Sequence, residues 1–263
     1  MIPLRDSIRL ARLPVVTIAL IAANVIAYLL SIRDGGSILG GPPASTVVAY
    51  GAIPYEFTHP SSHCGLALAG FGTPVVCSGQ PGVTGTPPAQ PATWETVFTS
   101  MFLHANLLHI GGNMLFLAVF GATVEDAVGR LRFLVYYLLA GIAALALAIA
   151  VGPDTTSPTL GASGAIAAVL GGYILLFPRA RVLTVVLLIV FFTIVELPAW
   201  VMLGLWLIFD ALLGAFGVST PFGGGAGVAY YAHIGGFAFG LLAVRAFARG
   251  RPPSPGYAPP RIA

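Results

Sequence analysis

Charge is scarce in this sequence, and one charged residue type is missing altogether. Only 8% of the 263 residues are Asp, Glu, Lys or Arg, and none is lysine, so all 12 basic side chains are arginines. Hydrophobic residues make up 57% of the chain, and its mean hydropathy is +0.92. This composition excludes an ordinary soluble domain and indicates an integral membrane protein. The arginines lie in short clusters between apolar runs, a pattern that reflects membrane topology and disfavours nucleic-acid binding.

Three further features are absent. No internal repeat or inverted symmetry is visible, which disfavours a transporter. No small-residue cleavage site follows the first apolar run at 14–32, so this run is expected to be an uncleaved span and not a signal peptide. The histidines show no H-E-x-x-H pattern and no acid on their helix face, which disfavours a metalloprotease, so no metal is expected.

Six crossings account best for the apolar runs, which lie at 14–32, 105–123, 131–151, 162–177, 182–216 and 228–247. The run at 182–216 is too long for one crossing and leaves no room for a loop between two. With six crossings and the N-terminus inside, 11 of the 12 arginines lie on one side, and only Arg33 lies on the other. We therefore expect one span near 198–216, approached by an interfacial or re-entrant segment at 182–195.

The expected fold is an all-α membrane protein, a six-transmembrane-helix bundle that forms a single domain over 1–263. A short cytoplasmic N-terminus at 1–13 precedes the first span, and a cytoplasmic tail at 248–263 follows the last. A long extracytoplasmic loop at 33–103 is rich in Gly, Pro, Ser and Thr. This loop is expected to fold partly against the membrane surface.

Two features bear on the compartment. Cys64 and Cys77 share the long loop, and the sequence leaves open whether they stay free or form a disulfide, which would contribute about 3 kcal/mol. The Arg-rich, Lys-free single bundle suits a bacterial cytoplasmic (inner) membrane with both termini cytoplasmic, although organelle membranes stay open.

Strongly polar side chains inside apolar spans are costly, which makes them functional candidates. The second span holds His109 and Asn113, which lie four residues apart on one helix face. The fourth span opens with Ser163, and the sixth holds His233. In the expected topology these groups all lie in the outer half of the bundle, so they share one depth.

This set of side chains suits nucleophilic catalysis. A serine hydroxyl needs a base to take its proton, and His233 is a suitable base for Ser163. Asn113, His109 and the backbone N–H groups at the start of the fourth helix can donate to the resulting oxyanion. No Asp or Glu is placed to orient His233, so a Ser-His dyad is expected and not a triad.

Small residues recur every four positions along the two helices that carry Ser163 and His233. They are Gly164, Ala168 and Gly172 in the fourth span, and Gly236 and Gly240 in the sixth. Such stripes let helix backbones pack closely in lipid. If the two stripes face one another, Ser163 and His233 meet at the top of the contact.

The segments "HIGGN" (109–113), "GASG" (161–164) and "AHIGGFAFG" (232–240) resemble, in this order and on these spans, the bacterial-type rhomboid family of intramembrane serine proteases. The resemblance implies Ser163 as the nucleophile, His233 as the general base, and His109 with Asn113 as oxyanion stabilisers. It implies that the site works without metal or cofactor. It also implies structural or packing roles near the site for His104, Gly161, Gly164, Gly236 and Gly240. Some relatives have a tyrosine one turn after the nucleophile. Ala167 stands there in this sequence, so His233 must be held in another way.

The expected function is that of an intramembrane serine endopeptidase. It would hydrolyse peptide bonds in or near transmembrane segments of other membrane proteins. Its partners are those substrates and the lipid bilayer, with no nucleic acid, and activity as a monomer is compatible with the sequence. The alternative is a catalytically inactive relative that binds membrane helices.

Overall fold

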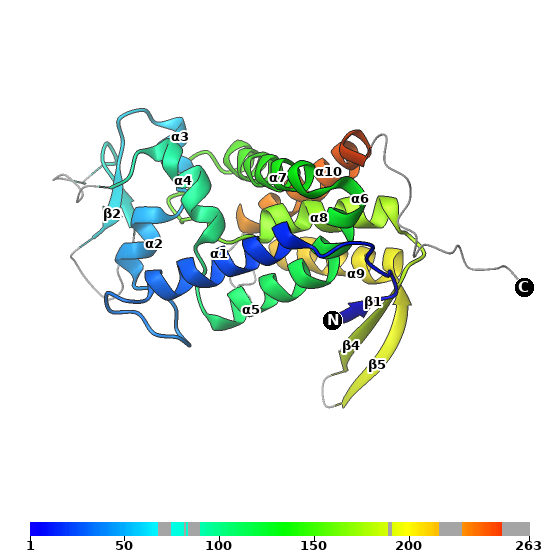
Figure 1. The fold of residues 1–263 in the computed structure, drawn as a ribbon. Helices are drawn as coiled ribbons and strands as arrows, with labels where there is room; N and C mark the ends of the chain where they lie inside the picture. Colours follow the sequence, from blue (N-terminus) through cyan, green and yellow to red (C-terminus); the bar gives the residue numbers. More distant parts are fainter. Residues whose placement is uncertain (68–74, 82, 84–89, 189–190, 216–227, 249–263) are drawn as a thin grey trace, which may run out of the picture.

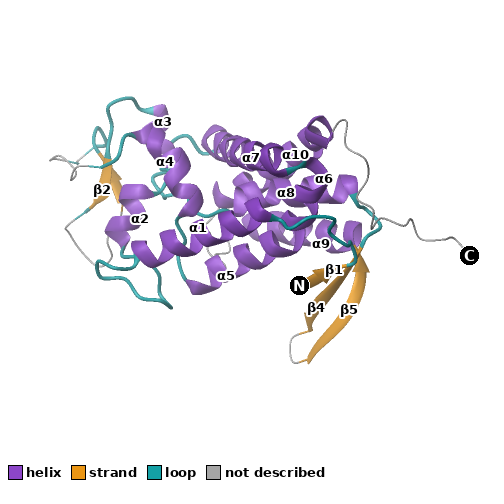
Figure 2. Cartoon of the chain, viewed as in Figure 1, coloured by secondary structure: helices purple, strands orange, loops and turns teal. Residues whose placement is uncertain are grey.

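The computed structural model describes residues 1–67, 75–81, 83, 90–188, 191–215 and 228–248. The described chain is mostly helical, with the long helices side by side in one bundle and short elements at its two ends (Figures 1 and 2). One end, which we call the sheet end, carries a sheet of β1 (Ile2–Asp6), β4 (Arg181–Leu188) and β5 (Phe191–Pro198). The other end, which we call the loop end, carries α2 (Ala44–Tyr50), α3 (Pro54–Thr58), α4 (Thr93–Thr99) and β2 (Cys64–Leu66). The cytoplasmic tail expected at 248–263 lies almost wholly outside the described residues.

The bundle consists of apolar helices, of which α5, η2 and α6 form one continuous stretch. Their bounds are α1 Val15–Ser31, α5 Leu107–Phe116, η2 Leu117–Gly121, α6 Ala122–Val128, α7 Arg130–Val151, α8 Ser163–Leu176, α9 Ala199–Ala215 and α10 Val228–Ala248. Among the described residues, three helical stretches are long and apolar enough to cross a membrane: Leu107–Val128, Arg130–Val151 and Tyr230–Ala248. A six-span bundle requires that the shorter apolar helices α1, α8 and α9 also cross.

Helix α8 lies at the centre of the bundle, and every residue from Ala165 to Tyr173 is buried. A helix that is apolar on all sides is a buried helix. Its glycine and alanine residues let α10 approach it very closely. A Cβ on Gly236 would collide with the backbone carbonyl of Gly164, and a Cβ on Gly240 would collide with that of Ala168. The two small-residue stripes therefore face one another.

Arginine and acid side chains tie the helix ends together at the sheet end. Arg130 donates to the carbonyl of Leu13 just before α1, and Arg132 donates to that of Phe247 near the end of α10. The buried Glu125 carboxylate accepts the backbone N–H groups of Val16 and Thr17 at 3.0 and 2.7 Å. A carboxylate placed there stabilises the first turn of α1.

The expectation of an all-α chain is wrong at the sheet end. Strands β4 (Arg181–Leu188) and β5 (Phe191–Pro198) form an antiparallel hairpin, and β1 (Ile2–Asp6) pairs with β4. The hairpin projects from the bundle (Figure 1), so the segment expected as an interfacial or re-entrant approach to α9 folds as strands. The run is dominated by Val, Ile, Thr and Phe. Those residues favour strands, a preference that a hydropathy count does not register.

The N-terminal strand is also anchored to the bundle. The Asp6 carboxylate accepts from the Thr123 hydroxyl at 2.7 Å and from the Tyr173 hydroxyl at 2.8 Å. Burial raises the pKa of Asp6, and these hydrogen bonds oppose that rise. The segment 1–13, expected as a plain cytoplasmic terminus, is thus part of the folded structure.

The long segment after α1 folds into short elements at the loop end. They are α2 Ala44–Tyr50, α3 Pro54–Thr58, β2 Cys64–Leu66, β3 Val75–Cys77, α4 Thr93–Thr99 and the 3-10 turn η1 Ser100–Phe102. This layer contacts the chain just before α8. Ala52 pairs with Thr159, and the Gly161 N–H donates to the Ser100 carbonyl at 2.8 Å. The loop layer thereby positions the start of α8.

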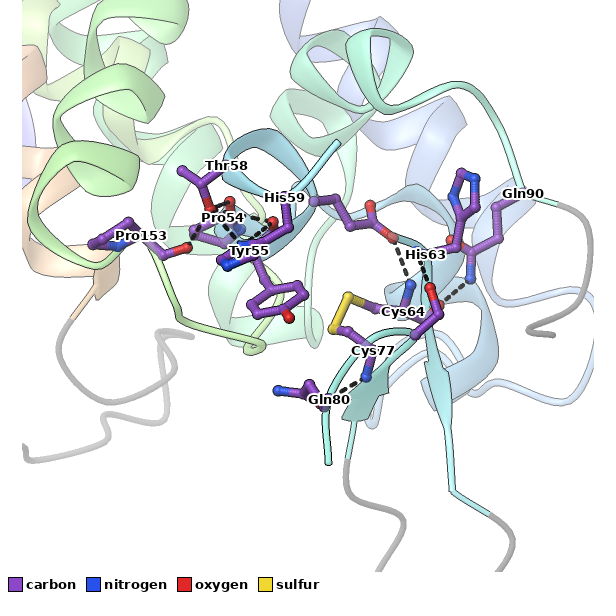
Figure 3. The surroundings of a disulfide bond; sticks show 12 residues. Pro54, Tyr55, Thr58, His59, His63, Cys64, Cys77, Gln80, Gln90 and Pro153 are labelled. Carbon is purple, nitrogen blue, oxygen red and sulfur yellow. Dashed lines mark hydrogen bonds between the residues drawn. A yellow bond between two sulfur atoms is a disulfide. The ribbon is translucent and has the colours of Figure 1, made fainter. Parts of the chain in front are cut away.

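Cys64 and Cys77 form a disulfide across β2 and β3 (Figure 3), which settles the pairing that the sequence left open. Both cysteines are fully buried with Val48, Ile53 and Tyr55. The Glu56 carboxylate accepts the Cys64 N–H at 2.7 Å, and burial raises the pKa of Glu56. A buried carboxyl group and a disulfide therefore fix one small core at the loop end.

The disulfide joins cysteines that are 13 residues apart in the sequence. A closed loop of that size restricts the unfolded chain, so replacing both cysteines with serine is expected to lower the free energy of unfolding by about 3 kcal/mol. Denaturant titration in detergent measures the change. A reductant should lower the wild type to the level of the variant and leave the variant unaffected. Equal stability of the oxidised wild type and the variant would contradict the expectation.

Candidate active site

Ser163 and His233 meet at the loop end of the α8–α10 contact. Ser163 is the first residue of α8, and His233 lies one to two turns into α10. His233 Nε2 lies 2.7 Å from Ser163 Oγ, within hydrogen-bonding distance. Residues that are 70 positions apart in the sequence are thus joined because the glycine stripes bring the two backbones together.

The other ring nitrogen of His233 faces a carboxylate that the sequence reasoning missed. Asp210, on α9, has Oδ1 at 2.9 Å and Oδ2 at 3.0 Å from His233 Nδ1. Both side chains are only 13% exposed. The expectation that no Asp or Glu orients His233 is therefore wrong. The signal was present, because Asp210 is the only ionisable residue in the apolar run 198–216, and such residues are functional candidates.

Aromatic rings complete the surroundings of the imidazole. The ring centroids of Trp206 and Tyr230 lie 6.0 and 6.2 Å from that of His233. Ala167, one turn after Ser163, is fully buried and offers only a methyl group. The ring of His233 is therefore held by α9 and by its own helix, and not by a large side chain from α8.

His109 and Asn113 are both buried on α5, one turn apart, and both lie beside the turn that precedes Ser163. Both side chains lie close to Gly161 in this turn. A Cβ atom added to Gly161 would lie 2.8 Å from His109 Nε2 and 3.6 Å from Asn113 Nδ2. The Ala105 N–H donates to His109 Nδ1 at 3.3 Å. In a neutral ring this leaves the proton on Nε2, the nitrogen nearer Gly161.

The amide nitrogen of Asn113 is buried and makes no hydrogen bond within the described part of the structure. Buried donors are normally paired, so an unpaired donor beside the turn that leads into Ser163 calls for an explanation. A group that bears negative charge only during a reaction is one such explanation.

His104 lies beside His109. Its Nδ1 is hydrogen-bonded to the Phe102 carbonyl, and its ring packs edge-on against the His109 ring. Its contacts are structural.

A cavity of about 30 Å³ opens beside Ser163. Its walls include Val97 from α4, Met101 from η1, Ala144 from α7 and Ala232 from α10. One water needs roughly 10–15 Å³ of such space. The cavity therefore has room for about two water molecules next to the serine hydroxyl.

For the serine endopeptidase expected from the sequence, replacing Gly161 with alanine should lower kcat/KM about 100-fold, the cost of misplacing a catalytic group by about 1 Å. Gly161 has φ +113°, and its missing side chain leaves room for His109 at 2.8 Å. An alanine there is strained and displaces His109 or Ser163. Proteolysis assays measure the effect. Gly111→Ala is the matched control, because a Cβ at Gly111 meets nothing within 4 Å. Equal activity of the two variants would contradict the prediction.

Comparison with known proteins gives a family match. Residues 91–250, which include α5 and α7 to α10, match the family model described as Rhomboid domain. The chain is 34% identical over 158 residues to Rhomboid protein 1, mitochondrial, of Saccharomyces cerevisiae, covering 56% of this chain and 40% of that protein. It is 32% identical over 109 residues to the human Presenilin-associated rhomboid-like protein, mitochondrial, covering 40% and 28%. The chain thus spans less than half the length of these relatives.

The same comparison corrects the expected location. The two relatives are named as mitochondrial proteins, and this overturns the prediction of a bacterial cytoplasmic membrane. The arginine pattern predicts which helix ends share a side of the bilayer. It carries no information on which membrane the bundle occupies.

Proposed function

The chain belongs to the rhomboid family, and we propose that it is a serine endopeptidase that cleaves other membrane proteins in or near their transmembrane segments. The observation that carries this proposal is the 2.7 Å contact between His233 Nε2 and Ser163 Oγ, beside a cavity with room for water. A base in contact with a hydroxyl is what nucleophilic catalysis by serine requires. The mitochondrial relatives favour a mitochondrial membrane for this chain.

The proposed reaction has two halves. In the first, Ser163 Oγ attacks the scissile carbonyl carbon while His233 Nε2 takes the hydroxyl proton. The C–N bond then breaks, and His233 returns that proton to the leaving nitrogen, which leaves an acyl ester on Ser163. In the second half, His233 takes a proton from water, the resulting hydroxide attacks the ester carbonyl, and Ser163 leaves with the proton. The cavity beside Ser163 is where that water is expected.

Both halves pass through a tetrahedral carbon whose oxygen bears negative charge. We assign His109 Nε2–H and Asn113 Nδ2–H as its donors. Both lie beside the turn that contains Gly161, and the amide nitrogen of Asn113 has no partner before the reaction begins. The N-terminus of α8 is the positive end of its helix dipole, and it favours negative charge at the same point. Donors that are already in place when the charge develops need no reorganisation.

Six crossings are proposed for the bundle, with α1, α8 and α9 joining the three longer spans. The site then lies at the loop end, near one membrane surface, where water can reach Ser163. A substrate helix buries its own carbonyls in hydrogen bonds, so it must unwind locally before cleavage. We therefore expect cleavage at small or helix-breaking residues near that surface.

Replacing Asn113 with alanine is expected to lower kcat about 100- to 1,000-fold with little change in KM, because a donor of this kind acts mainly on the transition state. Asn113→Asp keeps the size and removes the donor, so it should be at least as slow. Steady-state cleavage of a membrane substrate separates kcat from KM. A rise in KM with kcat unchanged would assign Asn113 to substrate binding instead.

A fluorophosphonate tests the proposal without a known substrate. Ser163 Oγ forms the bond to phosphorus, fluoride leaves, and the hydroxyl proton passes to His233. Folded wild type in detergent should be labelled at Ser163, and heat-denatured protein should not. Absence of any Ser163 adduct on folded protein would favour the alternative, a relative that binds membrane helices without cleaving them.

A further inference from the structure

Asp210 is an acidic side chain placed at cost inside an apolar helix. It is the only ionisable residue of α9 (Ala199–Ala215), its side chain is 13% exposed, and α9 packs against α8 and α10. An intramembrane carboxylate is retained where it has a partner and a role. Its partner here is His233, because both carboxylate oxygens lie within 3.0 Å of Nδ1.

The contact decides which tautomer His233 adopts. A carboxylate can only accept hydrogen bonds, so the nitrogen that faces it, Nδ1, must carry the proton. Nε2 is then left with its lone pair toward Ser163 Oγ at 2.7 Å. This is the only neutral form of the ring that can take the serine proton. With the carboxylate removed, the ring is free to adopt the other tautomer, which cannot act as the base.

The contact also bears on the charge that the reaction creates. When His233 takes the proton from Ser163 it becomes an imidazolium, and a carboxylate at 2.9 Å stabilises that cation. One turn after Ser163 on α8, residue 167 is alanine and offers the ring no hydrogen-bonding group. Within the described residues, the Tyr230 ring on α10 also lies beside His233, and His109 on α5 lies next to the Gly161 turn that precedes Ser163. Phenols and imidazoles are not anions at neutral pH.

We infer that Asp210 is a positioning residue that completes a Ser163–His233–Asp210 triad, with α9 performing the orienting role that α8 does not. This inference rests on the proposed function, because it assigns the carboxylate a part in the same proton transfer. It differs from the dyad expected from the sequence. It also gives α9 a part in the reaction beyond packing.

The test is the rate of fluorophosphonate labelling at Ser163, measured against pH. Asp210→Asn keeps the shape of the side chain and removes its charge. It should lower the rate at neutral pH on the order of 10,000-fold, the loss seen when a triad aspartate is changed to asparagine. The acid limb of the pH profile should move to lower pH, because the imidazolium loses its counter-charge. Asp210→Glu restores the charge and should recover part of the rate.

Three outcomes are informative. A wild-type rate and an unmoved acid limb in Asp210→Asn would overturn the inference while leaving the proposed function standing. A slower rate with an unmoved acid limb and a lowered unfolding midpoint would show that Asp210 only supports packing, and would also overturn it. If the wild type itself is not labelled at Ser163, the proposed function fails and the inference fails with it. Glu196→Gln on β5, an exposed acid at the sheet end, is the charge control and should match the wild type.

Discussion

Replacing Ser163 with alanine is expected to abolish cleavage of a membrane-protein substrate, with kcat falling about 10⁶-fold. The reason is chemical, because alanine has no oxygen with which to form the acyl ester. Little else changes at this position: Ser163 opens α8, and its hydroxyl contacts His233. The folded structure should therefore survive the substitution, and the variant should still bind substrate.

Single-turnover cleavage measures this directly, with enzyme reconstituted in liposomes in excess over a labelled substrate. The unfolding midpoint of Ser163→Ala in detergent is the folding control and should match the wild type. Substrate binding by the inactive variant is a second control. Cleavage at the wild-type rate by Ser163→Ala would remove the serine from the mechanism, whatever its distance from His233.

Replacing Gly236 with leucine is expected to destroy both the fold around α8 and the activity. The Cβ of any side chain at Gly236 collides with the backbone carbonyl of Gly164. Backbone cannot rotate aside as a side chain can, so α8 and α10 must separate. Overpacking by even a few methylenes costs about 1–3 kcal/mol, and a separated pair carries Ser163 and His233 away from one another. Gly236→Ala should show a smaller loss of the same kind.

The matched control is Gly204→Leu on α9, where a Cβ meets nothing within 4 Å. Unfolding midpoints and labelling at Ser163 should be near the wild type for Gly204→Leu and strongly lowered for Gly236→Leu. If Gly236→Leu is as stable and as active as the control, the helices do not pack as described. The close contact of α8 with α10 would then not be what assembles the site.

Much of the site follows from the sequence because its chemistry is local to motifs. Ser163 and His233 are polar groups in apolar runs, and the glycine stripes indicate which helices approach one another. The same motifs led to the rhomboid family, and the match over residues 91–250 confirms that prediction. Periodicity alone does not give the 2.7 Å contact, which depends on how far each helix is displaced along its neighbour.

Asp210 was missed for a reason that can be stated physically. It lies 23 residues before His233 on a helix with no matching motif, and it meets the imidazole only because α9 packs beside α10. Its isolation in an apolar run was the available signal.

The hairpin β4–β5 was missed because hydropathy does not distinguish a buried helix from a strand rich in Val, Ile and Phe. The two cysteines carried no geometry, so the sequence could not decide their pairing.

If Ser163 and His233 act as one unit in a proton transfer, a double-mutant cycle on single-turnover cleavage shows it. Ser163→Ala, His233→Ala and the double variant should then be equally inactive, because losing either partner already removes the whole effect. If the losses multiply instead, so that the double variant is slower than the wild type by the product of the two single-variant factors, the two residues act independently and this unit does not exist.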